Sequence, residues 1–169
     1  MVLRTTAVAI LLFFSALFCE ETKKKSLEWL TFGKALETSK KDKKPIYVYL
    51  YGTYCGWCKK FNKETLSDTT IINKLSQHFV ITKLNTASTE TQEFQGEQVS
   101  ERQIATIFAV RGVPSNVFMD SLGTIIAKIP GYMPPDKFTP VLQYISDGWY
   151  KDMTYQEYID SGDKLKKKK

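Results

Sequence analysis

The segment over residues 46–58 constrains the fold more than any other part of this 169-residue chain. Its first part, IYVYLY, is β-branched or aromatic almost throughout, and Gly52 ends it. A short apolar run of this kind is typical of a central strand that is buried on both faces. Cys55-Gly56-Trp57-Cys58 follows, and the pattern predicts a helix from Cys55 to about Leu66. The sequence therefore predicts a buried strand that leads into a helix carrying two cysteines.

The rest of the chain alternates helix and strand patterns. Four further helices are expected. Three begin at a capping residue: Thr31, before the inward residues Phe32, Ala35, Leu36 and Ser39; Asp68, before Ile71, Ile72 and Leu75; and the capping box of Ser100 and Gln103, before Ile104, Ile107 and Phe108. The fourth has Phe138, Val141, Leu142 and Ile145 on its inward face, with Pro140 in the first turn or at a kink. Strands are expected over 79–84, 116–119 and 124–129, a turn over 120–123, and a surface loop or small hairpin over 86–99. This order predicts an α/β fold with a mixed central sheet flanked by helices.

A second capping box, Thr154 with Glu157, precedes Tyr155, Tyr158 and Ile159. It predicts a short extra helix packed on the domain. We therefore expect a C-terminal helical extension and basic tail over residues 148–169, because five of the last six residues are lysines.

Composition excludes several function classes. The net charge of +6 is concentrated in that lysine-rich tail, and no basic stripe interleaves with aromatic residues elsewhere, so no nucleic-acid partner is expected. The chain holds three cysteines and a single histidine, His78, which we place at a helix end. A zinc knuckle would need two ligands besides Cys55 and Cys58. We expect no metal and no cofactor.

The N-terminus has the pattern of an export signal. Arg4 is followed by an apolar run from Ala7 to Phe18, which is the length of a signal-peptide core and shorter than a membrane span. We expect a signal peptide over residues 1–19, a flexible linker over 20–26, and a periplasmic or secreted protein. The alternative is a lipid anchor on Cys19, although Phe18 is larger than the small residue that normally precedes a lipidated cysteine.

Cys55 and Cys58 are the candidate catalytic residues. A helix N-terminus stabilises an anion, so the Cys55 thiolate is favoured, and Lys59 and Lys60 add positive charge. A spacing of three on a helix brings the two cysteines within reach of a disulfide. We expect Cys55 to attack a substrate disulfide and Cys58 to resolve the mixed disulfide. A purely structural role for a Cys55–Cys58 disulfide is a weaker interpretation, because it would close a very small loop and constrain little of the unfolded chain.

Together these residues resemble a known family. The segment YLYGTYCGWCKKF resembles the active-site segment of thioredoxin-fold oxidoreductases, and Lys83-Leu84-Asn85, Gly112-Val113-Pro114, Phe118 to Gly123 and Gly131 continue the match. The resemblance covers residues 27–147, which we take as a thioredoxin-like domain. The stretch from Phe94 to Ile159 looks more like exported bacterial thioredoxins, including those associated with sulfur-oxidation clusters.

The resemblance implies further site residues around the cysteine pair. It implies a cis bond before Pro114, which would bring the Val113 backbone beside the cysteines to bind substrate as an added strand. Tyr54 and Trp57 become candidates for an exposed apolar rim, with Gly56 between the cysteines.

Two departures from the family pattern also concern the site. Tyr49 stands where the family has a buried acid, so Lys83 loses its expected partner; Tyr49 is expected to fill core space. Trp57 replaces a proline between the cysteines, and that dipeptide influences the reduction potential.

The sequence thus predicts an exported thiol–disulfide oxidoreductase that reduces disulfides of substrate proteins. It has no second dithiol in the mature chain and no Gly-rich dinucleotide fingerprint, so we expect another protein, a membrane dithiol electron donor, to reduce it again. A dithiol oxidant or isomerase, and a non-catalytic binding module with an inert disulfide, are the alternatives.

Overall fold

The structure is a computed structural model that describes residues 26–162. The expected signal peptide, all but the last residue of the expected linker, and the lysine tail lie outside these residues. Across the described range, no helix combines the length and the apolar character that crossing a membrane requires.

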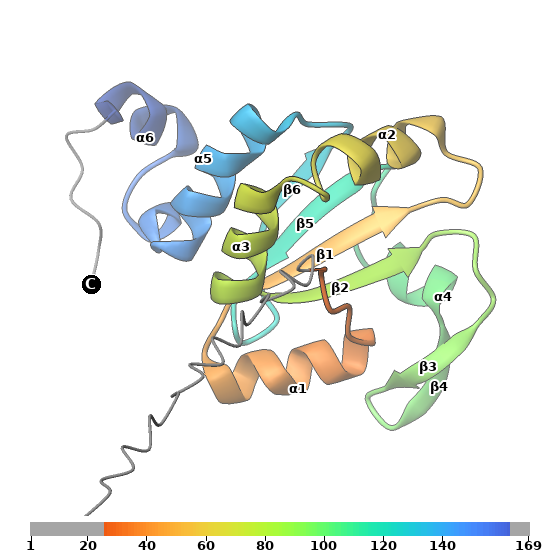
Figure 1. Cartoon of the computed structure of the whole chain (residues 1–169). Helices are drawn as coiled ribbons and strands as arrows, with labels where there is room; N and C mark the ends of the chain where they lie inside the picture. Colours follow the sequence, from red (N-terminus) through yellow and green to blue (C-terminus); the bar gives the residue numbers. More distant parts are fainter. Residues whose placement is uncertain (1–25, 163–169) are drawn as a thin grey trace, which may run out of the picture.

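A four-stranded mixed sheet forms the centre of the domain (Figure 1). Its strands are β1 (Ile46–Tyr51), β2 (Val80–Asn85), β5 (Ser115–Met119) and β6 (Ile125–Pro130), in the order β2-β1-β5-β6. β1 is parallel to β2 and antiparallel to β5, and β5 is antiparallel to β6. The mixed α/β sheet expected from the sequence is confirmed.

Helices cover both faces of this sheet (Figure 1). One face carries α1 (Phe32–Asp42) and α4 (Glu101–Thr106), and the other carries α2 (Gly56–Glu64), α3 (Thr69–His78) and α5 (Pro135–Ser146). The stretch over 86–99 forms part of a separate hairpin, β3 (Thr91–Phe94) and β4 (Glu97–Ser100). Its two-residue turn is Gln95-Gly96, and both of these residues have positive φ.

The pleat of β1 divides the core in two. Tyr47, Tyr49 and Tyr51 point to the side covered by α2, α3 and α5, while Ile46, Val48 and Leu50 point to the side covered by α1 and α4. All of them except Tyr51 are buried. This explains why the strand is apolar throughout instead of alternating with polar residues.

Three of the four expected helix caps form the expected hydrogen bonds. Asp68 caps α3, and the boxes of Ser100 with Gln103 and Thr154 with Glu157 start α4 and α6 (Tyr155–Ser161). Thr31 stands at the N-cap of α1, but its side chain makes no capping hydrogen bond.

One expectation about a helical side chain is corrected. Ile107 does not point inward: its side chain is 54% exposed. α4 ends at Thr106, and the backbone N–H of Ile107 bonds back to Ile104 in a tighter turn, so the helical period no longer aims the side chain at the core. Of the two alternatives expected for Pro140, a place in the first turn is excluded, because Pro140 lies inside α5.

The C-terminal extension packs on α5 through tyrosines. A 3₁₀ turn, η1 (Trp149–Lys151), leads into α6. The Tyr144 hydroxyl of α5 donates a 2.6 Å hydrogen bond to the Met153 carbonyl, and the Tyr144 ring contacts Tyr155 and Tyr158. The expected short C-terminal helix is confirmed.

Candidate active site

Cys55 and Cys58 form a disulfide at the start of α2, where the chain leaves β1. Cys55 is the N-cap residue, and its backbone N–H bonds to the Gly52 carbonyl at 3.2 Å. The two Cα atoms are 5.2 Å apart. The backbone N–H of Cys58 donates to Cys55 Sγ at 3.0 Å. One sulfur therefore takes the capping position that a serine or aspartate oxygen usually takes.

The two sulfurs differ in access to solvent. Cys55 is half-buried at the helix end, whereas Cys58 is 2% exposed. In the reduced protein the N–H groups and the dipole of α2 would stabilise a thiolate on Cys55. Of the two cysteines, Cys55 is therefore the more exposed to solvent.

The loop before β5 lies directly against this pair. The Val113–Pro114 peptide bond is cis, and Cys55 Sγ lies 3.5 Å from the Val113 carbonyl oxygen. Pro114 is buried and Val113 is half-buried. The structure thus brings together residues that are separated by more than fifty positions in the chain.

An aromatic shelf stands beside the pair at the outer end of α2. We call Trp57, Lys60, Glu64 and Tyr132 the Trp57 shelf. The Trp57 and Tyr132 ring centroids are 5.8 Å apart, and Lys60 Nζ lies 5.3 Å and 4.9 Å from them. The Tyr132 hydroxyl donates a 2.6 Å hydrogen bond to Glu64, which raises the pKa of Tyr132.

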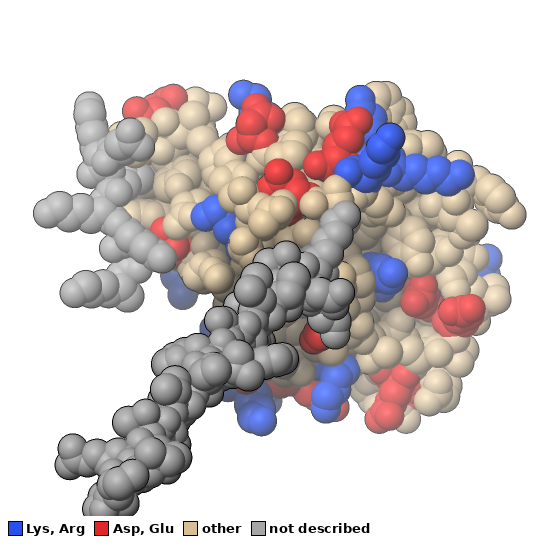
Figure 2. Space-filling view, viewed as in Figure 1, with Lys and Arg blue, Asp and Glu red and all other residues tan. Residues whose placement is uncertain are grey.

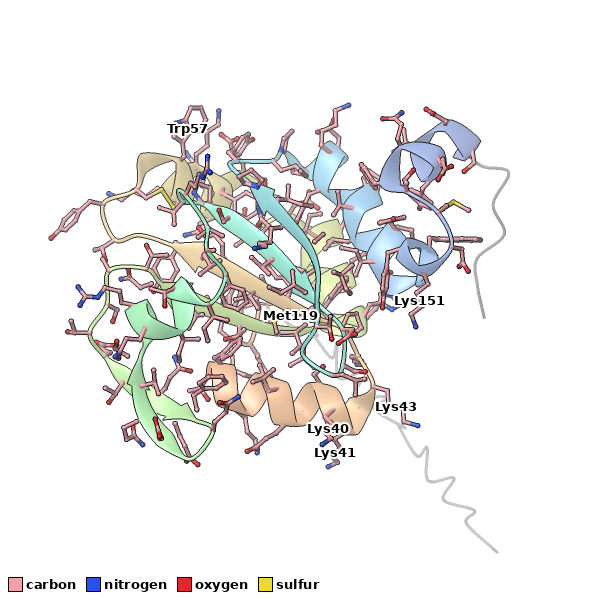
Figure 3. The ribbon with its side chains drawn as sticks, turned by 180° about the vertical axis from the view of Figure 1, so that it is seen from behind. Lys40, Lys41, Lys43, Trp57, Met119 and Lys151 are labelled. Atoms are coloured by element: carbon pink, nitrogen blue, oxygen red, sulfur yellow. A yellow bond between two sulfur atoms is a disulfide. The ribbon has the colours of Figure 1, made fainter. Side chains whose placement is uncertain are left out.

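The shelf leaves aromatic surface open beside Cys55. Trp57 is 59% exposed and projects from α2 in Figure 3, and Tyr54 is 97% exposed. Gly56, between the cysteines, is also exposed. Sequence reasoning missed Tyr132, since it lies 75 residues after Trp57 and no local pattern connects the two.

Tyr49 lies beneath the pair and fills core space. It is 2% exposed, its ring stacks on Tyr51, and its hydroxyl donates a long 3.4 Å hydrogen bond to the Cys58 carbonyl. Burial raises the pKa of Tyr49 well above its usual value. The hydroxyl is therefore neutral near pH 7 and is no substitute for a carboxylate base.

Lys83 faces Tyr49 across the β1–β2 register but takes aromatic partners. Its Nζ lies 5.6 Å from the Trp29 ring and 5.9 Å from the Tyr51 ring. Both Lys83 and Tyr49 line a cavity of about 360 Å³. Over residues 26–162, no cluster of three or more histidine, cysteine or acidic side chains could hold a metal ion.

Comparison with known proteins shows the family of the chain. Residues 32–146 match the thioredoxin-like domain family. The chain belongs to that family. The match begins with α1 and ends with α5, so it includes the sheet, the cysteine pair and the cis-proline loop.

Relatives and structural neighbours point to the same fold. The chain is 27% identical over 110 residues to "Disulfide bond reductase DsbH" of Chlamydia pneumoniae, an alignment covering 64% of this chain and 65% of that protein. It is 32% identical over 108 residues to "Thiol:disulfide interchange protein DsbD" of Pectobacterium atrosepticum, covering 63% of this chain and 17% of that one. The chain thus spans less than two thirds of the length of these relatives.

A solved thioredoxin-fold protein from Helicobacter pylori superposes over 86% of this chain and 92% of its own, with a TM-score of 0.65 and 23% identity. At this identity the superposition shows the fold alone. The fold expected from the sequence is confirmed.

Proposed function

We propose that this protein is an exported thiol–disulfide oxidoreductase that reduces disulfide bonds of substrate proteins through Cys55 and Cys58. The observation that carries the proposal is the disulfide at the start of α2, with one accessible sulfur and one shielded sulfur beside a cis-proline loop. The similarity to proteins named disulfide bond reductase and thiol:disulfide interchange protein supports it.

The reaction needs only the two cysteines and a substrate disulfide. The Cys55 thiolate attacks one substrate sulfur, the substrate S–S bond breaks, and one substrate thiolate leaves. Cys58, deprotonated, then attacks Cys55 Sγ, which releases the second substrate thiolate. Two electrons pass to the substrate, and its two thiolates take up the two protons that the cysteines lost.

The neighbouring groups would favour the first step. The Cys58 N–H and the α2 dipole stabilise the Cys55 thiolate, and the Val113 carbonyl offers a backbone acceptor to an extended substrate segment. Trp57 and Tyr54 supply exposed aromatic area for contact with that segment. In the second step Tyr49 cannot take the Cys58 proton, because its hydroxyl is already protonated.

The reductive direction requires a supply of electrons. We propose that a membrane dithiol protein transfers them to the Cys55–Cys58 disulfide, in a periplasmic or extracellular location. The export pattern over residues 1–19 and the names of the relatives support this location and direction.

Trapping of mixed disulfides tests the division of labour. Cys58→Ser should accumulate a covalent complex with a substrate or donor protein through Cys55, because no thiol remains to resolve it. Cys55→Ser is the matched control, and it should trap little, because the Cys58 sulfur is shielded. Non-reducing gels of envelope extracts give the comparison.

Trapping through Cys58 alone, or equally through both cysteines, would overturn the assignment. If neither variant traps a partner, the result favours the alternative of an inert disulfide in a binding module.

A further inference from the structure

The end of the molecule opposite Cys55 carries an exposed group of lysines. Lys40, Lys41 and Lys43 lie at the C-terminal end of α1, and Lys44 follows them. Lys151 of η1 is drawn on the same side of the molecule as Lys40, Lys41 and Lys43 in Figure 3. We call these five lysines the basic end.

The basic end faces away from the redox pair. β1 starts two residues after Lys44 and ends four residues before Cys55, so a six-residue strand of roughly 20 Å separates the two. In Figure 3 the labelled lysines of α1 lie at the opposite end of the molecule from Trp57, and Figure 1 gives the same separation between the end of α1 and α2.

Lys151 Nζ lies 5.7 Å from the Tyr150 ring, but the ammonium groups of the basic end form no ion pair within the described residues. Among residues 26–162, no carboxylate oxygen lies within 4.0 Å of the five ammonium groups. Figure 2 shows lysine and acidic side chains intermixed on its face of the molecule. The carboxylates near the basic end are Glu28, Glu37, Asp42, Asp120 and Asp152. One Asp120 oxygen already accepts two backbone N–H bonds of its own turn.

An exposed leucine lies in the β5–β6 turn, near the end of α1. Met119 pairs with Ile46, which places the β5–β6 turn at the start of β1 and beside α1. Leu122 in this turn is 81% exposed, and it lines a hollow together with Leu36 of α1. Lys40 follows Leu36 by one helical turn, so Leu122 lies near a lysine of the basic end. An exposed leucine near lysines is a combination that suits an anionic lipid interface.

The described chain also begins at this end. Leu30 bridges Thr82 in the parallel direction, so the residues before Leu30 run back toward the start of β2. Ser26 lines the same hollow as Asp42 and Lys44. Lys23-Lys24-Lys25 directly precede Ser26 in the sequence and lie outside the described residues.

We propose that the basic end binds a surface of anionic phospholipid headgroups, with the lysines on the phosphates and Leu122 in the interface. Clusters of four to eight lysines are sufficient for such binding, which weakens with salt. In this orientation Cys55 points away from the lipid and stays accessible to partner proteins. The proposal deepens the exported location proposed above, but it does not depend on redox chemistry.

Vesicle sedimentation of the native protein, in the form recovered from cells, tests the proposal. Binding to phosphatidylcholine vesicles containing phosphatidylglycerol is compared with binding to phosphatidylcholine alone, at low salt and at high salt. We expect salt-sensitive binding to the anionic vesicles only. The triple variant Lys40→Gln, Lys41→Gln, Lys43→Gln should lose at least about tenfold in affinity.

Matched controls separate this surface from net charge. The triple variant Lys34→Gln, Lys63→Gln, Lys137→Gln removes the same charge elsewhere and should bind within about twofold of the parent. Leu122→Gln should weaken binding, whereas Ile159→Gln on α6 should not. Circular dichroism checks that each variant is folded. A variant with both cysteines replaced by serine should bind the vesicles as the parent does, and this result separates lipid binding from the redox function.

Three results would overturn the proposal. The first is an equal loss of vesicle affinity in the two triple variants, and the second is binding that does not depend on anionic lipid. The third is binding that persists in the α1 triple variant but disappears when residues 164–169 are removed. Alkylation of reduced Cys55 should proceed as fast on the vesicles as in solution. Protection of Cys55 by the lipid would contradict the proposed orientation.

Discussion

Replacing Tyr49 with aspartate places a carboxylate in the core beneath the cysteine pair. The Tyr49 ring is 2% exposed and contacts Trp29, Tyr51 and Phe61. Removing a large buried side chain typically costs about 3–5 kcal/mol, and a buried carboxylate adds a desolvation cost. We expect Tyr49→Asp to lower the free energy of unfolding by at least about 3 kcal/mol at pH 7, a large share of the about 5–15 kcal/mol of a typical domain.

The loss should depend on pH in a defined direction. Burial raises the pKa of the new aspartate in the folded state above its unfolded value of about 3.9. Between these two pKa values the folded state binds more protons, so stability falls as pH rises. The deficit relative to the parent should therefore be smallest below about pH 4 and should grow until the folded-state pKa is passed.

Urea unfolding of the oxidised protein at several pH values measures this deficit. Tyr49→Phe is the control: it keeps the ring and loses only a 3.4 Å hydrogen bond to Cys58, so it should cost about 1 kcal/mol or less. The reasoning is refuted if Tyr49→Asp unfolds within about 1 kcal/mol of Tyr49→Phe at neutral pH, or if its deficit does not change with pH.

Three further outcomes are expected. Asn116→Ala leaves the buried Tyr47 hydroxyl without its 2.7 Å hydrogen-bond partner and should lower the free energy of unfolding by about 1–3 kcal/mol. Adding Tyr47→Phe should cause a smaller further loss, and additive losses in urea unfolding would contradict this. Gly33→Ala would press a new Cβ against the Glu93 backbone carbonyl, so it should cost about 1–3 kcal/mol and speed hydrogen exchange in β3 and β4; unchanged exchange there would count against the close packing. Burial raises the pKa of Tyr47 and Tyr49, so the stability that their protonated hydroxyls contribute is present below pH 10 and is lost as pH rises above it. An ultraviolet titration in which all nine tyrosines ionise together near pH 10 would disprove this pKa shift.

The central strand and its cysteines could be predicted because the signals are local. The run over 46–51 is apolar on both faces because each face meets its own layer of helices. The capping residues Asp68 and Ser100 act within three positions of themselves, so their hydrogen bonds are readable from the sequence. The family motifs extended this reading to the fold, which the comparisons confirm.

Contacts between distant segments could not be predicted in the same way. The partners of Lys83 are aromatic rings at positions 29 and 51, and Tyr132 reaches Trp57 only because β6 ends beside α2. Ile107 was misplaced because periodicity does not show where a short helix stops. Four lysines of the basic end are neighbours in the sequence, over residues 40–44, but only the fold brings Lys151 to the same side of the molecule.

The central claim is that Cys55 and Cys58 form a reducing redox pair. Equilibration of the native protein with glutathione or dithiothreitol buffers, followed by mass counting of alkylated cysteines, measures its reduction potential. The account predicts a reversible two-electron transition nearer to that of thioredoxin, about −270 mV, than to that of the oxidant DsbA, about −120 mV. A potential near the DsbA value, or a disulfide that excess dithiothreitol leaves intact, would contradict it.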